Sequence, residues 1–564
     1  MGSKLSTPKR KLFSIFILLF LSFSLVLLLA STFRLIRNQS TVIARQVQNV
    51  IISQEIPHRI IYSSRRRNGR FLSDFIAKEF KGKEIYIGLV NIHEGEDEAN
   101  EWEELGETSL VHFKRVSRGL KWQELFPLWV DEEEKWRTPN CSEIPMPKFE
   151  DYGEFDVVIA RVPCGIEGEK KGNRDLYRLQ VNLVVANLVM KNGYKNGDQS
   201  MFVVFIGSCG PMWEIFRCDD LLRHEGEVWI YKPDLRRLKH NVFMLNGACQ
   251  SSAPHMRLDA GEGNNGYNFS ELHNPIDQPR EAYVTVLHSS EDYVCGAIVL
   301  AQSIAKTNST KDLVLLADNS ISERSRRALK AVGWKIKPIE RIESPHASKN
   351  AYNRWNYSKL RIWQLIEYDK VIFVDSDLIV LKNIDKFFKH PQLSAVKDSN
   401  IFFNSGIMLI EPSNCIFDTL MEKRYTLLSY NGGDQGFLNE AFTWWNRWPA
   451  KLNYFKMIHQ EEKMRQDKIF ESVYTIHYFG IKPWMCYRDY DCNWDTIDRR
   501  KYVSDTAHKL WWQVHDGMPK RLQKFCDLSV KNELRIKKFR ELAMNASLPD
   551  EHWKIKVKDP RQHV

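Results

Sequence analysis

The sequence lacks the features of several non-globular classes of protein. Only 10 of its 564 residues are cysteine, too few for a small fold held together by disulfides. Its charges nearly balance, with 81 basic and 71 acidic residues and a net charge of +10, so nothing indicates a nucleic-acid partner. It also lacks a disordered composition, since 43% of its residues are hydrophobic and 12% are aromatic. A globular protein remains, and its length predicts roughly two to four domains.

One long hydrophobic run is present near the N-terminus. Residues 12–33 (LFSIFILLFLSFSLVLLLASTF) carry no charge over 22 residues, enough for a helix that spans a bilayer. More basic residues precede the run than follow it directly, which places residues 1–11 in the cytosol as a short tail. A cleaved signal peptide is the alternative, but its apolar core is normally shorter and ends in a small-residue site. We therefore expect a single-pass type II membrane anchor, followed by a polar stem at residues 34–82.

Two further features agree with a body in the lumen of the secretory pathway. Some cysteines could form disulfides there, and Cys486 and Cys492 are the nearest pair in sequence, although buried thiols would explain the cysteines equally well. Six N-x-S/T sequons could carry glycans in that compartment. They begin at Asn38, Asn140, Asn268, Asn308, Asn356 and Asn545.

Residues 83–270 are expected to form a first α/β module, in which no motif indicates chemistry. Residues 174–193 predict a helix that ends at Asn192-Gly193, and GEGNNGYN at 261–268 is typical of a linker. Short segments rich in branched and aromatic residues predict strands between these features. The expected strands are residues 84–92, 155–162, 201–207 and 227–233.

A second unit, residues 281–490, alternates strands with helices. This order predicts an α/β fold with a mostly parallel sheet and helices on its faces. Ligands of such sheets bind beyond the carboxyl ends of the strands. We expect strands at 283–290, 313–320 and 370–374, and helices at 293–307, at 322–333 with Ser322 as N-cap, and at 359–369.

The stretch KVIFVDSDLIVL (370–381) places Asp375 and Asp377 inside an otherwise apolar segment. An uncompensated buried carboxylate costs several kcal/mol, so the pair needs a cation, hydrogen-bond donors or exposure at a strand end. Strand side chains repeat every two residues, so both carboxylates would point the same way and suit Mn²⁺ or Mg²⁺. Taken alone, a D-x-D pattern is equally typical of solvated carboxylates in a turn.

Three later motifs give the D-x-D pattern a context. FFNSGIMLIEPS (402–413), NGGDQGFLNE (431–440) and HYFGIKPW (477–484) follow it in order. With them, residues 281–490 resemble glycosyltransferase family eight, the glycogenin-like retaining transferases with a GT-A fold. The upstream module and the anchor further resemble the plant glucuronosyltransferases that decorate xylan. The resemblance implies a UDP-sugar donor, a polysaccharide acceptor such as xylan, and Mn²⁺.

The resemblance also implies roles for individual residues. It makes Asp375, Asp377 and His477 the metal ligands, and it gives Lys482 a contact with the diphosphate, where fixed positive charge stabilises the leaving UDP. Gly480 lets the backbone approach the diphosphate, and residues of VLHSSEDY (286–293) hold the uracil and ribose. The implied nucleotide-sugar contacts are Leu287, Ser289, Ser290, Tyr293, Lys359, Asp375, Ser376, Asp377, Asp398, Asn404, Asp434, Gln435, His477, Gly480 and Lys482.

The implied catalytic residues are Asp434, Gln435 and Lys482. Asp434 would stabilise the oxocarbenium-like centre or act as the nucleophile, so both a covalent intermediate and same-face attack stay open. Some family members carry an acid where this chain has Asn431, and the missing negative charge is compatible with an anionic donor such as UDP-glucuronate.

The leading hypothesis is a Golgi membrane enzyme that transfers glucuronic acid to xylan, with its catalytic domain in the lumen and with no nucleic-acid partner. A different UDP-sugar (galacturonate, galactose or glucose) on another glycan is one alternative. A non-catalytic subunit of a polysaccharide synthase complex is another, and homo- or hetero-oligomers are compatible with each. Residues 491–564 predict a helical extension, in which KNELRIKKFRELA (531–543) would pack on the catalytic domain or contact a membrane or partner.

Overall fold

The computed structural model describes most of the chain after residue 70. The described residues are 71–92, 102, 104–125, 142–164, 174–195, 201–242, 245–246, 249–250, 279–399, 401–489, 501–547 and 551–561. The chain divides into two units, Met1–Asp74 and Phe75–Val564, and both large sheets and the site lie in the second. The expected tail (1–11), anchor (12–33) and linker (261–268), and the sequons at Asn38, Asn140 and Asn268, lie outside the described residues. Within those residues, no helix combines the length and the apolar character needed to cross a membrane.

The folded region begins earlier than the expected boundary at residue 83. Residues 71–80 form a helix, and Leu72, Phe75 and Ile76 on it are buried. These apolar residues recur at the three- and four-residue spacing of one helix face. This part of the expected stem is therefore folded.

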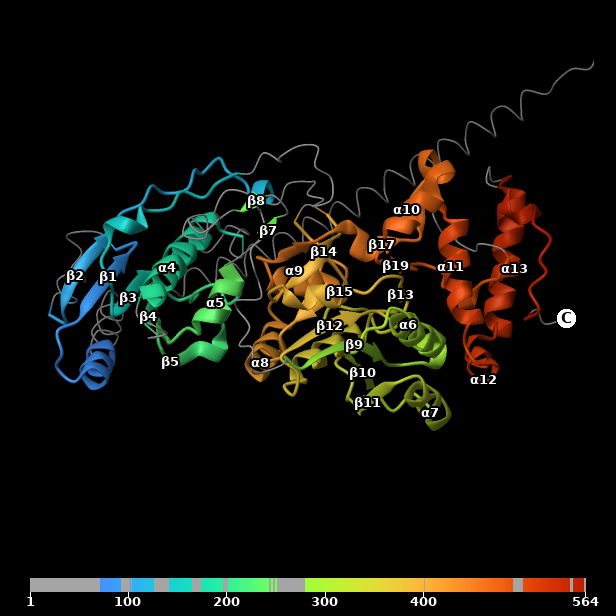
Figure 1. The fold of residues 1–564 in the computed structure, drawn as a ribbon, viewed down its shortest axis with the longest axis horizontal. Helices are drawn as coiled ribbons and strands as arrows, with labels where there is room; N and C mark the ends of the chain where they lie inside the picture. Colours follow the sequence, from blue (N-terminus) through green and yellow to red (C-terminus); the bar gives the residue numbers. More distant parts are fainter. Residues whose placement is uncertain are drawn as a thin grey trace, which may run out of the picture. The chain divides into compact units, whose positions relative to one another are not determined.

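A six-stranded sheet is the centre of the N-terminal module (Figure 1). Its order is β2-β1-β3-β4-β6-β5; the first four strands run parallel, and β6 pairs antiparallel with β4 and β5. The expected strands correspond to β1, β3, β4 and β6, whereas β2 and β5 were not expected because both are mostly exposed edge strands. The bounds are β1 Tyr86–Val90, β2 Glu107–Val111, β3 Val157–Arg161, β4 Phe202–Ile206, β5 Leu221–Glu225 and β6 Val228–Tyr231.

Two helices complete this module, α4 (Leu176–Lys195) and α5 (Leu235–Val242). The prediction that α4 ends at Asn192-Gly193 is wrong, because the helix continues to Lys195. Asn192 is buried, and its side-chain amide donates a hydrogen bond to the carbonyl of Phe155 at 2.7 Å. This asparagine therefore fastens the helix to the module and does not terminate it.

A seven-stranded sheet forms the C-terminal domain, in the order β11-β10-β9-β12-β15-β14-β16. The strands β11, β10, β9 and β12 are parallel, as expected, and β15 enters antiparallel between β12 and β14. The bounds are β9 Glu281–Leu287, β10 Asp312–Ala317, β11 Trp334–Pro338, β12 Lys370–Val374, β14 Ser394–Lys397, β15 Phe403–Ile410 and β16 Asn446–Trp448.

Both faces of this sheet are covered, which explains the continuous apolar runs of its strands. Helices α6 (Val294–Lys306) and α7 (Glu323–Ala331) share one apolar core with alternate strand residues such as Tyr283. Helices α8 (Asn414–Lys423) and α9 (Asp434–Ala441) pack with the other set, such as Val284. The predicted helices at 293–307 and 322–333 are confirmed, including the Ser322 hydroxyl as the N-cap of α7.

One predicted helix is wrong in type and length. The segment expected as a helix at 359–369 is a 3-10 helix over Asn356–Gln364. Tyr357, Ser358 and Lys359 are buried in succession, so this segment packs on most of its circumference. Tertiary packing, and not one amphipathic face, therefore sets its backbone.

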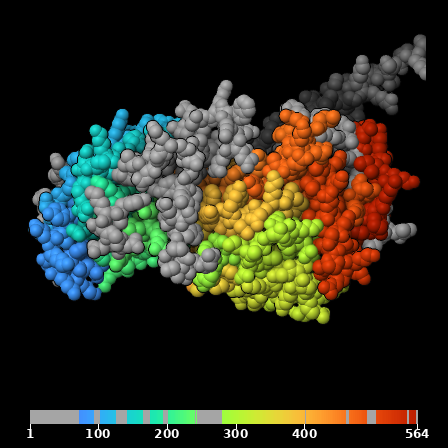
Figure 2. All heavy atoms as spheres, viewed as in Figure 1, coloured from blue at the N-terminus to red at the C-terminus, as the bar shows by residue number. Residues whose placement is uncertain are grey.

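The C-terminal segment is helical, as expected. Helices α11 (Asp505–Asp516) and α12 (Lys520–Gln523) adjoin α6, as Figure 2 shows by orange-red against yellow-green atoms, and Cys295–Cys526 bonds α6 to the turn after α12. Helix α13 (Val530–Asn545) packs Ile536 in a small core with Tyr487 of the catalytic region, which bears out the packing alternative for this helix. The remaining elements are β7 Leu245–Asn246, β8 Cys249–Gln250, β13 Leu378–Val380, β17 Tyr454–Phe455, β18 Met457–His459, α10 Gln466–Ser472, β19 Thr475–His477 and β20 Lys501–Val503.

Candidate active site

The D-x-D residues lie in a turn between two sheets. Strand β12 ends at Val374, and β13 begins at Leu378 in a separate three-stranded sheet with β19 and β17. Asp375 and Asp377 thus follow the carboxyl end of the predicted strand, but they do not share its two-residue repeat, since the Leu378 N–H closes a turn on the Asp375 carbonyl at 3.1 Å. The turn follows the carboxyl end of a parallel strand, where ligands of such sheets bind.

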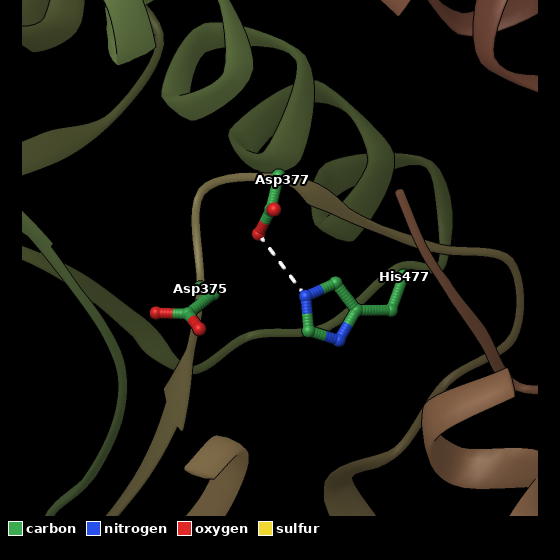
Figure 3. Close-up of side chains that lie close together, drawn as sticks. All are labelled: Asp375, Asp377 and His477. Carbon is green, nitrogen blue, oxygen red and sulfur yellow. Dashed lines mark ion pairs between the residues drawn. The ribbon is translucent and has the colours of Figure 1, made fainter. Parts of the chain in front are cut away.

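The structure brings Asp375, Asp377 and His477 together. Strand β13 pairs antiparallel with β19, and Leu378 lies opposite His477 in that register. One ligand atom from each of the three side chains lies within 4.8 Å of the others. Figure 3 shows the imidazole turned toward Asp377, with its Nε2 atom 3.4 Å from Asp377 Oδ1. Two carboxylate oxygens and one imidazole nitrogen fit a divalent metal ion.

A chain of amides holds the imidazole of His477. Its Nδ1 atom lies 3.1 Å from Asn453 Oδ1, and Asn453 Nδ2 donates to Asn404 Oδ1 at 2.9 Å. Because Nδ1–H donates to the amide oxygen, Nε2 is left to face the carboxylates. A Cβ at Gly406 would lie 2.6 Å from the imidazole Cε1, so only glycine fits beneath this ring.

Lys359 lies between the cluster of Asp375, Asp377 and His477 and the carboxylate of Asp434, which is the expected catalytic group. Its Nζ atom lies 2.6 Å from Asp434 Oδ2 and 3.4 Å from Asp375 Oδ1, and it donates to the Ser405 carbonyl at 3.1 Å. The Ser405 hydroxyl also donates to Asp434 Oδ2, at 2.8 Å. Asp434 is the first residue of α9, and both it and Lys359 are buried.

Lys482 neutralises the second carboxylate of the cluster. Its Nζ atom pairs with Asp377 Oδ2 and donates to the Tyr478 carbonyl at 3.0 Å. Gly480, between these residues, has a φ of +73°, a left-handed conformation that favours glycine. The motif HYFGIKPW therefore folds back on itself and directs His477 and Lys482 at the same aspartate.

The two aspartates of the cluster differ in pKa. Burial raises the pKa of Asp375 to about 6, even though Lys359 acts in the opposite direction. Burial would also raise the pKa of Asp377, but the nearby Lys482 ammonium, followed by a smaller effect of His477, outweighs it and holds that pKa well below its usual range. Burial lowers the pKa values of both lysines, but nearby carboxylates outweigh it. Asp375 and Asp434 raise the pKa of Lys359, and Asp377 raises the pKa of Lys482. The site thus concentrates charges of both signs in a largely buried environment, from which only the Asp375 carboxylate is partly exposed.

Gln435 and Asp398 lie beside Asp434, although they are less tightly bound. The Gln435 Oε1 atom accepts from the Ser405 N–H at 3.2 Å, and Gln435 Nε2 lies 3.4 Å from Asp398 Oδ2. Gln435 Nε2 also donates to the Tyr430 hydroxyl at 2.8 Å. The expected donor-sugar residues therefore gather at the N-terminal end of α9, with Tyr430 as an addition that no motif indicated.

The expected nucleotide residues lie at the end of β9. Leu287 is buried, and Ser290 caps the following 3-10 turn through its side chain. Ser289 has a φ of +70° and donates its N–H to Asp318 Oδ2 at 3.2 Å. Tyr293 is partly exposed and packs edge-on against Trp484 of HYFGIKPW, with ring centroids 6.0 Å apart.

Two supporting residues escaped the analysis of the sequence. Asp318 follows strand β10 and pairs with Arg341 at 3.1 Å, and the rule that ligand sites follow strand ends could have found it. Asn453 lies in a short 3-10 turn before β17, and no local pattern distinguishes it from other asparagines.

Comparisons with known proteins place the two halves of the chain separately. Residues 62–249 match the family model described as the GUX1-5 N-terminal domain, and residues 284–392 match glycosyl transferase family 8. A putative UDP-glucuronate:xylan alpha-glucuronosyltransferase 5 of Arabidopsis thaliana is 48% identical, with 87% of this chain and 88% of the relative covered. UDP-glucuronate:xylan alpha-glucuronosyltransferase 2 of the same plant is also 48% identical, over 84% and 80%. Human glycogenin-1 is 29% identical over 42% of this chain and 71% of its own length.

Proposed function

This chain belongs to glycosyl transferase family 8, among the UDP-glucuronate:xylan alpha-glucuronosyltransferases, and we propose that it transfers glucuronic acid from UDP-glucuronate to a xylan backbone with retention of configuration. The observation that carries this proposal is the completeness of the site. The cluster of Asp375, Asp377 and His477, the Lys359–Asp434 pair and Lys482 all meet in one place.

The metal in this proposal is Mn²⁺, held by Asp375, Asp377 and His477. A mixed oxygen and nitrogen donor set suits this ion, and the Asn453 contact presents the free imidazole nitrogen to it. When bound, the ion supplies positive charge at the diphosphate of the donor. Golgi localisation as a type II membrane protein belongs to the same proposal, and its support is the apolar run at residues 12–33.

The chain's own residues account for the charge that develops in the reaction. The bond between the anomeric carbon and the phosphate oxygen breaks, and its electron pair leaves with UDP, where the ammonium of Lys482 offsets the negative charge. The acceptor hydroxyl oxygen forms the new bond on the same face of the sugar, and its proton passes to the departing phosphate oxygen of UDP. Asp434 offsets the positive charge at the anomeric carbon, and Lys359 and Ser405 hold its carboxylate in place.

Donor specificity decides the proposal experimentally. The full-length chain in detergent, with Mn²⁺, is assayed for UDP release from UDP-glucuronate, UDP-galacturonate, UDP-glucose, UDP-galactose and UDP-xylose, with and without xylo-oligosaccharide. We expect acceptor-dependent release from UDP-glucuronate alone, and its loss in Asp377→Asn. Release from another donor would refute the substrate, and release from none, with acceptor present, would favour a non-catalytic subunit.

Replacement of Asp434 tests its assigned role. Asp434→Asn keeps the shape and the hydrogen bond to Ser405 but removes the charge opposite Lys359. We expect transfer to fall at least about 100-fold, with UDP affinity retained, because the charge acts on the transition state. UDP binding by calorimetry and turnover with UDP-glucuronate are the two measurements. Turnover near the wild-type value would remove Asp434 from the mechanism.

A further inference from the structure

The two ends of helix α9 have different neighbours. Its N-terminal end carries Asp434 and Gln435, which face the site. Its C-terminal end, from Asn439 to the residues after Ala441, contacts the N-terminal module, to which no motif gave a role. The helix has 8 residues and is therefore roughly 12 Å long, so a tilt at one end displaces the other.

Arg174 of the N-terminal module makes the most extensive of these contacts. Its Nη2 atom donates to the Asn439 carbonyl at 2.7 Å, and its Nη1 atom lies 3.3 Å from both carboxylate oxygens of Glu440. The guanidinium also stacks on Phe402, at 5.3 Å from the ring centroid. Phe402 in turn packs on Tyr430, whose hydroxyl accepts from Gln435.

Trp213 and Glu214 of the same module bind the last residue of α9 and the segment that follows it. The Trp213 indole N–H donates to the Ala441 carbonyl at 2.9 Å, and its ring stacks on Phe442. Glu214 Oε1 accepts from the N–H and the hydroxyl of Thr443, at 2.8 and 2.9 Å. Two carbonyls that the end of the helix leaves without helical partners, and the N–H of a residue just beyond it, are thus satisfied by another part of the chain.

Packing alone does not hold this end of α9. A cavity of about 280 Å³, whose lining includes Trp213, Glu214, Glu440 and Ala441, lies at the contact. Inside the domain, Asn439 bonds through its side chain to both the N–H and the carbonyl of Phe403, at 2.8 Å each. Phe403 is the first residue of β15 and directly precedes Asn404, so the same end of the helix also holds the start of β15 in place.

From these contacts we propose that Arg174, Trp213 and Glu214 are positioning residues: the N-terminal module clamps the far end of α9 and thereby fixes Asp434 and Gln435 beside the donor sugar. In this proposal, the module acts on the site through the helix. The inference rests on the proposed transfer reaction for its kinetic consequences, but the clamp itself has a readout that needs no activity.

A matched control comes from a second contact between the same two parts of the chain. Asp219 accepts from the Ser413 hydroxyl at 2.7 Å, at the start of α8 and away from α9. Its side chain is 27% exposed, similar to Arg174 at 19%. Asp219→Ala therefore removes a polar contact between module and domain, together with the Arg217 pair inside the module, without touching α9.

The test compares Arg174→Ala, Arg174→Lys, Trp213→Phe and Asp219→Ala in the full-length chain. Hydrogen exchange of residues 434–441 reports on the clamp directly, and kcat and KM for UDP-glucuronate report on its consequence. Trp213→Phe keeps an aromatic ring to stack on Phe442 but is smaller and lacks the indole N–H, so it remains informative if Arg174→Ala does not fold.

We expect faster exchange in α9 and a kcat about 10- to 100-fold lower in Arg174→Ala, with KM for the donor little changed. Arg174→Lys should recover part of the loss, Trp213→Phe should lose about 3- to 10-fold, and Asp219→Ala should match the wild type in both readouts. Wild-type exchange in α9 of Arg174→Ala and Trp213→Phe would overturn the clamp. So would an equal loss of kcat in Asp219→Ala. A wild type with no transfer would refute the proposed function, and exchange would still decide the clamp.

Discussion

At the scale of single residues, the site depends on side chains that orient the ones doing chemistry. Asn453 is the clearest case, because its amide joins His477 to Asn404 and makes no contact with the aspartates in the structure. A ligating imidazole can rotate and exchange tautomers unless its second nitrogen is held. The affinity for a metal ion is therefore set partly by a residue outside the three ligands.

Replacement of Asn453 should weaken metal binding more than it weakens the fold. In Asn453→Ala the imidazole of His477 loses its hydrogen-bond partner, and we expect the Mn²⁺ affinity to fall about 10- to 100-fold. The measurement is the Mn²⁺ concentration for half-maximal binding by calorimetry. Asn182→Ala, which removes a buried amide of α4 bonded to Met212, is the control and should leave this concentration unchanged. Equal Mn²⁺ affinity in Asn453→Ala and wild type would contradict the assignment.

His508 should make stability depend on pH. Burial, followed by the charge of Lys456, lowers the pKa of His508 to about 4, and Arg561 adds in the same direction against hydrogen bonds to Tyr487 and Arg488. Its Nε2 atom lies 3.1 Å from the Trp512 indole nitrogen and 3.0 Å from the Arg488 carbonyl oxygen.

The direction of the change in stability follows from comparing this pKa with that of histidine in the unfolded chain, about 6.5. The unfolded chain binds the proton first, so this contribution is complete above pH 6.5 and is lost as the pH falls toward 4. We expect a loss of up to about 3 kcal/mol in the free energy of unfolding across this window. Urea unfolding of wild type and His508→Gln at several pH values measures it. Parallel curves for the two proteins would contradict the prediction.

At the scale of elements, helix α6 presses directly on the D-x-D turn. A Cβ at Gly296 would collide with the Ser376 carbonyl and would lie 2.6 Å from the Trp484 ring. The helix therefore approaches the turn as closely as a backbone can. Since Trp484 belongs to HYFGIKPW, the same glycine brings the helix against both motifs that supply the candidate metal ligands.

Gly296→Ala should destabilise the protein, although replacing glycine by alanine inside a helix usually stabilises it. Alanine normally stabilises a helix interior by roughly 0.5–1 kcal/mol. Here we expect a loss of about 1–3 kcal/mol, because backbone cannot move aside as a flexible side chain can. Thermal unfolding is the measurement, and Gly153→Ala, which meets nothing within 4 Å, is the control. A stabilised Gly296→Ala protein would show that the turn can yield.

At the scale of the whole molecule, the second unit is stabilised as one body by apolar packing and by disulfides. One apolar core includes Val158 and Leu183 of the N-terminal module together with Val284 and Phe437 of the C-terminal domain. The disulfide Cys218–Cys415 joins the same two parts, while Cys164–Cys209 and Cys295–Cys526 each close within one of them. Cys486, which the sequence suggested as a candidate, is disulfide-bonded as well.

Removal of the long-range disulfide should cost more than removal of a short one. Cys218 and Cys415 are 197 residues apart, against 45 for Cys164 and Cys209. Loop closure in the unfolded chain then predicts a loss of about 3–5 kcal/mol for C218S/C415S, roughly 1 kcal/mol more than for C164S/C209S. Denaturant unfolding under oxidising conditions gives both values. The reverse order would indicate that the native contacts, and not chain entropy, set the contribution.

The sequence by itself determined the α/β class, four strands of the six-stranded sheet, three of the seven-stranded sheet, the family and several residues that meet at the site. These are local properties, because buried parallel strands require continuous apolar runs and the family motifs are short. Only the tertiary structure decided that Asp375 and Asp377 lie in a turn, that Asn453 holds His477, and that Arg174 reaches α9. The contacts from Asn453 to His477 and from Arg174 to α9 join separate elements, where no spacing rule applies, and the turn at Asp375 lies where the chain passes from one sheet to another. The exposed strands β2 and β5 and the 3-10 segment at Lys359 escaped prediction for the same reason, since their partners define them and their own residues do not.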